Sequence, residues 1–139
     1  MRSDRLVSLM MAALAALLLS TGGAVAQQSA FPVHIDMRID SYGVGGTGAF
    51  NSSLLPCASG TFVVNQGAVT HTFTCDVTGD TFQIGVSGPI TSNGFSTTWF
   101  FASGTGPFRG ISGRGNAIHT ANCPGPPCDI TLSGTARVQ

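Results

Sequence analysis

Side chains that could do chemistry are few in this chain, and histidine is the main candidate base. The sequence contains three histidines and no lysine or glutamate. Hydrolytic catalysis needs a nucleophile beside a base, paired carboxylates or a metal ion. His71 is the strongest candidate base, because it alternates in phase with Phe73 and Cys75 and should face the interior of a sheet. Such a position more often holds a core histidine that a neighbour satisfies, so His71 is a weak catalytic candidate.

Two other pairs of side chains have metal-binding chemistry. His34 and Asp36 alternate with apolar residues, which places both on the outward face of one strand. A surface metal site would need a second such pair, so we interpret them as part of a solvated face. Asp76 and Asp80 flank a glycine and could hold calcium, although aspartate beside glycine is also ordinary turn chemistry. We therefore predict no metal and no cofactor.

Arginines and aromatic residues supply the candidate ligand-binding positions. Trp99 and Phe101 share one face of a predicted strand and are expected in the core, so they would line a ligand pocket only if their rings leave unfilled space. Arg109 and Arg114 follow in a glycine-rich corner; they could bind an anionic group, although keeping that end of the barrel soluble is the favoured interpretation. Further phenylalanines are expected to be partly exposed and could form a self-association surface: Phe31, Phe100 and Phe108.

The elements that position these residues must be built from an unusual composition. Charged residues are 9% of the chain and the formal net charge is +0. A nucleic-acid-binding protein carries a basic patch, so we expect no nucleic-acid partner. Long exposed helices usually carry lysine and glutamate, both of which are missing. Serine, threonine, glycine and β-branched residues dominate instead, which favours β-sheet.

The N-terminal segment has the features of an export signal. Arg2 and Arg5 precede an apolar run, Leu6–Leu19, and Ala24-Val25-Ala26 has the small residues of a cleavage site. We predict a signal peptide over residues 1–26, cleavage after Ala26 and one mature domain over 27–139. The product is expected to be secreted or periplasmic, without insertion in a membrane. An uncleaved anchor is the alternative, disfavoured because the apolar run is short for a bilayer.

The four cysteines indicate disulfides in an exported chain. The turn-rich sequence between Cys123 and Cys128 could bring these two sulfurs together, which leaves Cys57 to pair with Cys75. Four cysteines allow three pairings, and the sequence favours this one without fixing it. Zinc is disfavoured, because the spacing lacks two-residue knuckles.

Apolar and polar residues alternate along most of the mature chain, with turn signals between the alternating runs. The runs predicted to be strands lie at 33–40, 60–65, 69–77, 82–86, 95–101, 113–118 and 130–138. We predict an all-β domain, a single small antiparallel barrel of about eight strands, with a two-layer β-sandwich as the alternative. A barrel is favoured because few charges are available to protect edge strands. Any helix should be short, and the polar outward face disfavours a transmembrane barrel.

A glycine-rich pattern occurs twice, as Gly46-Thr47-Gly48-Ala49-Phe50 and as Gly104-Thr105-Gly106-Pro107-Phe108. A phosphate-binding loop would need a following helix, which the sequence does not predict. The run from Trp99 to Gly115 resembles the glycine-rich signature of allene-oxide-cyclase-like and dirigent-like β-barrels, and of small secreted bacterial proteins of unassigned function that share it. The resemblance implies an eight-stranded barrel and leaves a homo-oligomer open. It matches no catalytic residue to a position here.

The function expected from these features is binding. The sequence predicts a disulfide-bonded barrel and shows no recognisable set of catalytic residues. We therefore favour a secreted barrel that binds a small apolar ligand or a protein partner near Gly104 to Arg114. An isomerase or cyclase-like enzyme that confines an apolar substrate, with His71 or Arg109 as its polar element, is the alternative. A structural role in the envelope is the second alternative.

Overall fold

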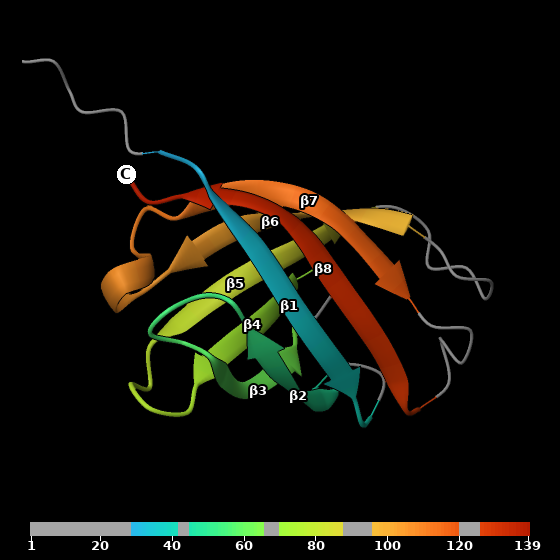
Figure 1. The fold of residues 1–139 in the computed structure, drawn as a ribbon. Helices are drawn as coiled ribbons and strands as arrows, with labels where there is room; N and C mark the ends of the chain where they lie inside the picture. The colour runs from blue at the N-terminus through green and yellow to red at the C-terminus, as the bar shows by residue number, and fades with distance from the viewer. Residues whose placement is uncertain (1–28, 42–44, 66–69, 88–95, 120–125) are drawn as a thin grey trace, which may run out of the picture.

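The computed structural model describes residues 29–41, 45–65, 70–87, 96–119 and 126–139. The predicted signal peptide at residues 1–26 lies outside these ranges. Eight strands and one turn of 3-10 helix make up the described part (Figure 1). They are β1 (Phe31–Ile39), β2 (Thr47–Ser52), β3 (Ser59–Val64), β4 (Thr70–Cys75), β5 (Thr81–Ser87), β6 (Ser96–Gly104), η1 (Gly106–Phe108), β7 (Ser112–His119) and β8 (Cys128–Arg137).

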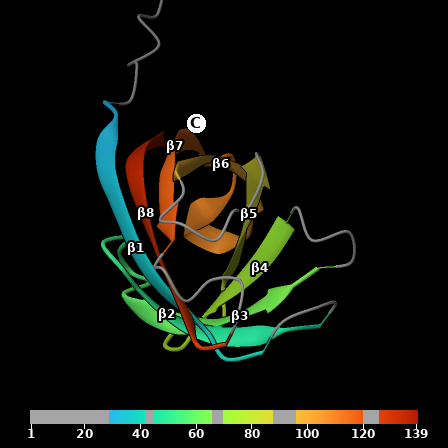
Figure 2. The ribbon, with the colours of Figure 1, turned by 90° about the vertical axis from the view of Figure 1, so that its right-hand side faces the viewer.

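The strands form one closed antiparallel barrel in chain order. Each strand pairs with the next, and β8 returns to pair with β1 from Phe31↔Ala136 to Ile39↔Cys128. Figure 2 shows the strands curving around a shared interior. The predicted eight-stranded barrel is confirmed, and the sandwich alternative is wrong. Closure satisfies the hydrogen-bonding groups that an open sheet would leave at its edges.

Alternation along the strands separates the interior from the surface. In β1, the buried side chains are Val33, Ile35, Met37 and Ile39, and the exposed ones between them include His34 and Asp36. Successive side chains of a strand point to opposite faces, so one apolar set from each strand reaches the barrel axis. Among the described residues no helix is long and apolar enough to span a membrane.

Aromatic rings fill much of the interior. Phe73 and Phe82 are stacked with centroids 4.8 Å apart, and Phe50 meets Phe73 edge-on at 5.1 Å. Phe108, expected to be partly exposed, is buried instead, because η1 turns its ring onto Phe82 at 5.3 Å. Trp99 packs edge-on against the neighbouring interior ring of Phe101 at 5.2 Å. These offset and edge-to-face contacts are the arrangements that aromatic pairs favour.

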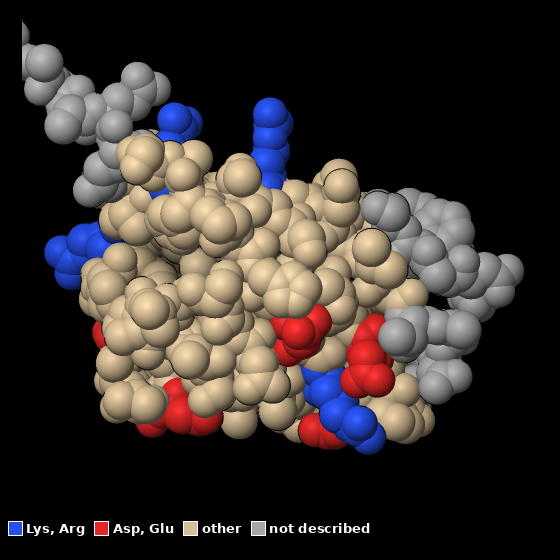
Figure 3. Space-filling view, viewed as in Figure 1, with Lys and Arg blue, Asp and Glu red and all other residues tan. Residues whose placement is uncertain are grey.

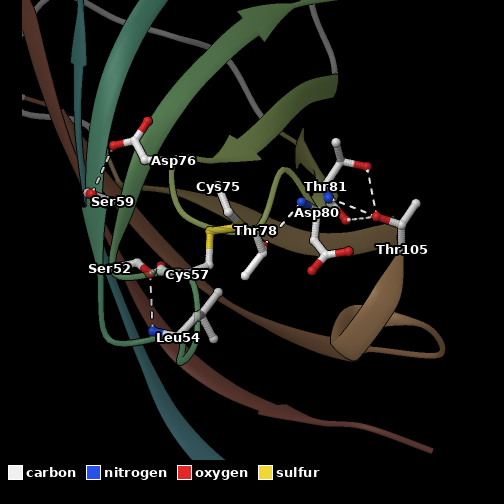
Figure 4. The surroundings of a disulfide bond; sticks show 10 residues. All are labelled: Ser52, Leu54, Cys57, Ser59, Cys75, Asp76, Thr78, Asp80, Thr81 and Thr105. Carbon is white, nitrogen blue, oxygen red and sulfur yellow. Dashed lines mark hydrogen bonds between the residues drawn. A yellow bond between two sulfur atoms is a disulfide. The ribbon is translucent and has the colours of Figure 1, made fainter.

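A disulfide joins the β2–β3 connection to the end of β4 (Figure 4). Cys57 and Cys75 are bonded, both buried, and 18 residues apart in sequence, as the sequence favours. A loop of this size is stabilised by about 3 kcal/mol in the chain-entropy model. The other predicted pair involves Cys123, which lies outside the described residues, whereas Cys128 is fully buried at the start of β8.

Strand β2 is the one strand that the alternation did not predict. It contains Gly48 and Phe50, each paired with a residue of the opposite size on β3. Gly48 pairs with Phe62, and Phe50 pairs with Gly60. A Cβ at either glycine would overlap the partner's ring. The glycines therefore make room for two large rings inside a narrow barrel.

Candidate functional site

The predicted pocket residues Trp99 and Phe101 point into the barrel core. Trp99 is completely buried, and its indole Nε1 donates a hydrogen bond to the Ser133 carbonyl at 3.2 Å. Phe101 meets Phe82 at 5.8 Å as part of the aromatic cluster. Both rings are surrounded by other side chains of the core, and the polar atom of Trp99 is already satisfied. Their placement is that of packing residues.

Three buried polar side chains lie toward the opposite end of the interior from the disulfide. His71 is the second residue of β4, Thr97 is the second residue of β6 and His119 ends β7, with exposures of 8%, 3% and 4%. The His71 Nδ1 and Thr97 Oγ1 atoms are buried and make no hydrogen bond within the described ranges. Burial lowers the pKa of His71, and the nearby His119 lowers it further. The imidazole of His71 is thus held in its neutral form.

The outer face of β1 and β8 carries a hydrogen-bonded network around His34. Its Nε2 atom lies 3.2 Å from Asp36 Oδ2, and its Nδ1 atom lies 3.4 Å from Ser133 Oγ. Thr131 Oγ1 donates to the other oxygen of Asp36 at 2.9 Å. The side chains of His34 and Asp36 are 56% and 57% exposed, so water competes for each contact. We interpret the network as surface pairing between strands, as the sequence predicts.

The two aspartates of the β4–β5 turn do not form a shared site. Ser59 Oγ donates to Asp76 Oδ2 at 2.9 Å, and Figure 4 shows the carboxylates of Asp76 and Asp80 pointing to different sides. The Asp80 carboxylate lies against Gly106, where a Cβ would overlap it. In the part of the chain that the structure describes, no cluster of three or more metal-ligating side chains occurs.

A cleft of about 420 Å³ opens on the outside of the barrel. It lies over β6, β7 and β8, near the start of β7 and the end of β8. The lining includes Phe100, Ser112, Gly113, Arg114, Thr135 and Arg137. Phe100, Arg114 and Thr135 form one row across the sheet, because Phe100 pairs with Arg114 and Arg114 pairs with Thr135. Ser112 pairs with Arg137 in the next outer row.

Phe100 gives this cleft its apolar wall. Its ring covers Gly85 on the neighbouring strand, where a Cβ would overlap it, and 45% of the residue remains exposed. Arg114, predicted to bind ligand, also lines the cleft. Arg109 follows η1, is exposed and is not part of the cleft lining. Sequence reasoning missed Arg137, since only the β7–β8 register brings it beside Ser112.

Comparison with known proteins does not add a family: no family model, no curated protein and no solved structure matches this chain. The functional argument therefore rests on the geometry of the chain itself.

Proposed function

We propose that this protein binds a small, largely apolar ligand in the cleft over β6, β7 and β8. The observation that carries the proposal is the half-exposed ring of Phe100 in a cleft of about 420 Å³. Cavities of roughly 300–1,000 Å³ with aromatic walls and a few polar groups are typical small-molecule sites. Part of the Phe100 ring packs over Gly85, and 45% of the residue is left exposed as an apolar surface beside the cleft.

The alternative proposal, an isomerase or cyclase-like enzyme acting through His71, has less support. Such an enzyme must enclose its substrate beside the catalytic group. Large aromatic side chains occupy much of the interior around the barrel axis. A site inside the barrel would require some of these rings to move, whereas the outer cleft is open as it stands.

The proposed setting of this activity is outside the cytoplasm. Disulfides persist in oxidising compartments, so the Cys57–Cys75 bond supports a secreted or periplasmic location. The eight-stranded barrel is compatible with the proposed resemblance to allene-oxide-cyclase-like and dirigent-like proteins. A protein partner, self-association into a homo-oligomer and a structural role in the envelope are competing proposals that the same experiment addresses.

Native mass spectrometry of the protein purified from its own host tests the proposal. We expect a small molecule to be retained by the unaltered protein and lost from Phe100→Ala, since that substitution removes the apolar wall. Leu55→Ala is the matched control, because Leu55 is exposed in the β2–β3 connection and does not line the cleft. A bare protein, or a ligand held equally by Phe100→Ala, would contradict the proposal.

A further inference from the structure

The charges around the cleft indicate what kind of ligand it takes. Arg114 on β7 and Arg137 on β8 both line it, and both are exposed. Within the described ranges neither guanidinium forms a salt bridge, whereas Arg38 on β1 lies 3.6 Å from Asp40. Figure 3 shows basic side chains projecting from the upper and left parts of the molecule, whereas the basic side chain in its lower part lies among acidic side chains.

Among the residues that the structure describes, the lining of the cleft contains two cations and no acidic side chain. Like charges on adjacent strands repel each other, and a bound anion would relieve that repulsion. Arginine is the residue best suited to planar oxyanions, since its guanidinium can donate two parallel hydrogen bonds to a carboxylate or phosphate.

Ser112 adds a hydroxyl group whose hydrogen-bonding capacity is unsatisfied within the described residues. Its Oγ atom is buried and makes no hydrogen bond to any residue that the structure describes. Ser112 lines the same cleft as the two arginines and pairs with Arg137 across the strands. A buried hydroxyl without a partner is uncommon, because losing its hydrogen bond to water costs free energy. An oxygen atom of a ligand could accept the bond that this hydroxyl offers.

We propose that the ligand is a small amphipathic oxyanion, with its carboxylate or phosphate between Arg114 and Arg137 and its apolar body against Phe100. This inference rests on the proposed function and adds the chemical class of the ligand. The apolar wall and the two guanidiniums lie in adjacent outer rows of the sheet, Phe100 with Arg114 in one row and Arg137 with Ser112 in the next. A ligand with one anionic end and one ring system would contact both rows at once.

Calorimetric titration with three matched probes tests the inference: naphthoate, naphthyl phosphate and the neutral naphthamide. We expect at least one anion to bind about tenfold more tightly than the amide, the difference typical of a charge-assisted hydrogen bond. Arg114→Gln and Arg137→Gln should each abolish most of that preference. Ser112→Ala should weaken binding of the anions by a few-fold, since it removes one neutral donor.

The control variant is Arg38→Gln, which removes a charge of the same sign from the end of β1 away from the cleft and should leave all three affinities unchanged. Equal binding of the anions and the amide would overturn the oxyanion inference while the proposed binding function survives. An anion preference that persists in both arginine variants would overturn it as well. Failure of every probe to bind, together with a bare protein in native mass spectrometry, would remove both proposals.

Discussion

His71 of β4 and His119 of β7 face the barrel interior from strands that do not pair, and electrostatic repulsion by His119 contributes to the lowered pKa of His71. Every aspartate and arginine that the structure describes lies on the outer face or in a connecting turn. No described carboxylate is among the groups that shift the pKa of His71. Burial and the neighbouring His119 both disfavour the charged form of His71, and its pKa is lowered from the usual value of 6.5.

The lowered pKa of His71 predicts a loss of stability in acid. Below pH 6.5 the unfolded chain binds a proton at this residue more readily than the folded chain does. The free energy of unfolding should therefore be largest above that pH and should fall as the pH drops toward the folded-state pKa. Urea denaturation at pH 8, 7, 6 and 5 measures it. His71→Gln should reduce the slope between pH 7 and 5, and His34→Gln, at an exposed position, should not.

The contribution of His119 can be separated by proton NMR titration of His71. Removing the like charge with His119→Gln should raise the pKa of His71, while burial still keeps it below the usual value. An unchanged pKa would mean that the two imidazoles do not interact. A pKa at the usual value in the parent protein would contradict the burial of His71 altogether.

The Cys57–Cys75 bond should contribute strongly to stability. Replacing both residues by alanine removes a bond across 18 residues and should lower the free energy of unfolding by about 3 kcal/mol. Chemical denaturation of the double variant beside the parent protein measures the difference. A loss below about 1 kcal/mol would show that the turn is held mainly by its packing and hydrogen bonds.

Adjacent phenylalanines on β6 provide a test of the strand's orientation. Phe101→Ala should cost about 3–5 kcal/mol, because it leaves a cavity in the core. Phe100→Ala should cost much less, since 45% of that residue is already exposed. Thermal and urea unfolding of both variants measure the contrast. Equal losses, or a larger loss at residue 100, would reverse the assignment of inner and outer faces.

Gly48→Ala tests why β2 contains glycine. The added Cβ would overlap the backbone carbonyl of Arg38 and the ring of Phe62, so we expect destabilisation of roughly 1–3 kcal/mol, typical of overpacking. Ala49→Ser is the control, because Ala49 is exposed on the same strand and should change stability little. If the two variants unfold alike, the Gly48–Phe62 contact does not constrain the barrel.

The barrel could be predicted from the sequence because alternation survives in most strands. In β1 every second residue is apolar and buried, so orientation and burial follow directly from residue type. Alternation did not predict β2, because one of its interior positions is occupied by Gly48 and the space there is filled by the Phe62 ring from β3. The two copies of the glycine pattern have different structures. The first copy runs into β2, whereas the second spans the end of β6 and η1, where Gly106 has a φ of 52°.

The cleft was harder to predict than the fold. Alternation suffices to place Phe100 outside and Phe101 inside the barrel. Trp99, two residues before Phe101, is buried on the same inner face. It does not say which outer residues of different strands become neighbours. Arg114 and Arg137 are far apart in the sequence, and the β7–β8 register alone places them in adjacent outer rows. A ligand site on the outside of a sheet depends on register, which local patterns do not encode.

The most direct test of binding in the outer cleft is to map which residues change their NMR shifts when a ligand binds. Backbone NMR shifts should be recorded while naphthoate is added to the protein. The account predicts the largest changes at Phe100, Arg114 and Arg137, with little change at the interior histidines. Changes centred on His71 and His119 would place the ligand inside the barrel and contradict the outer cleft as the binding site.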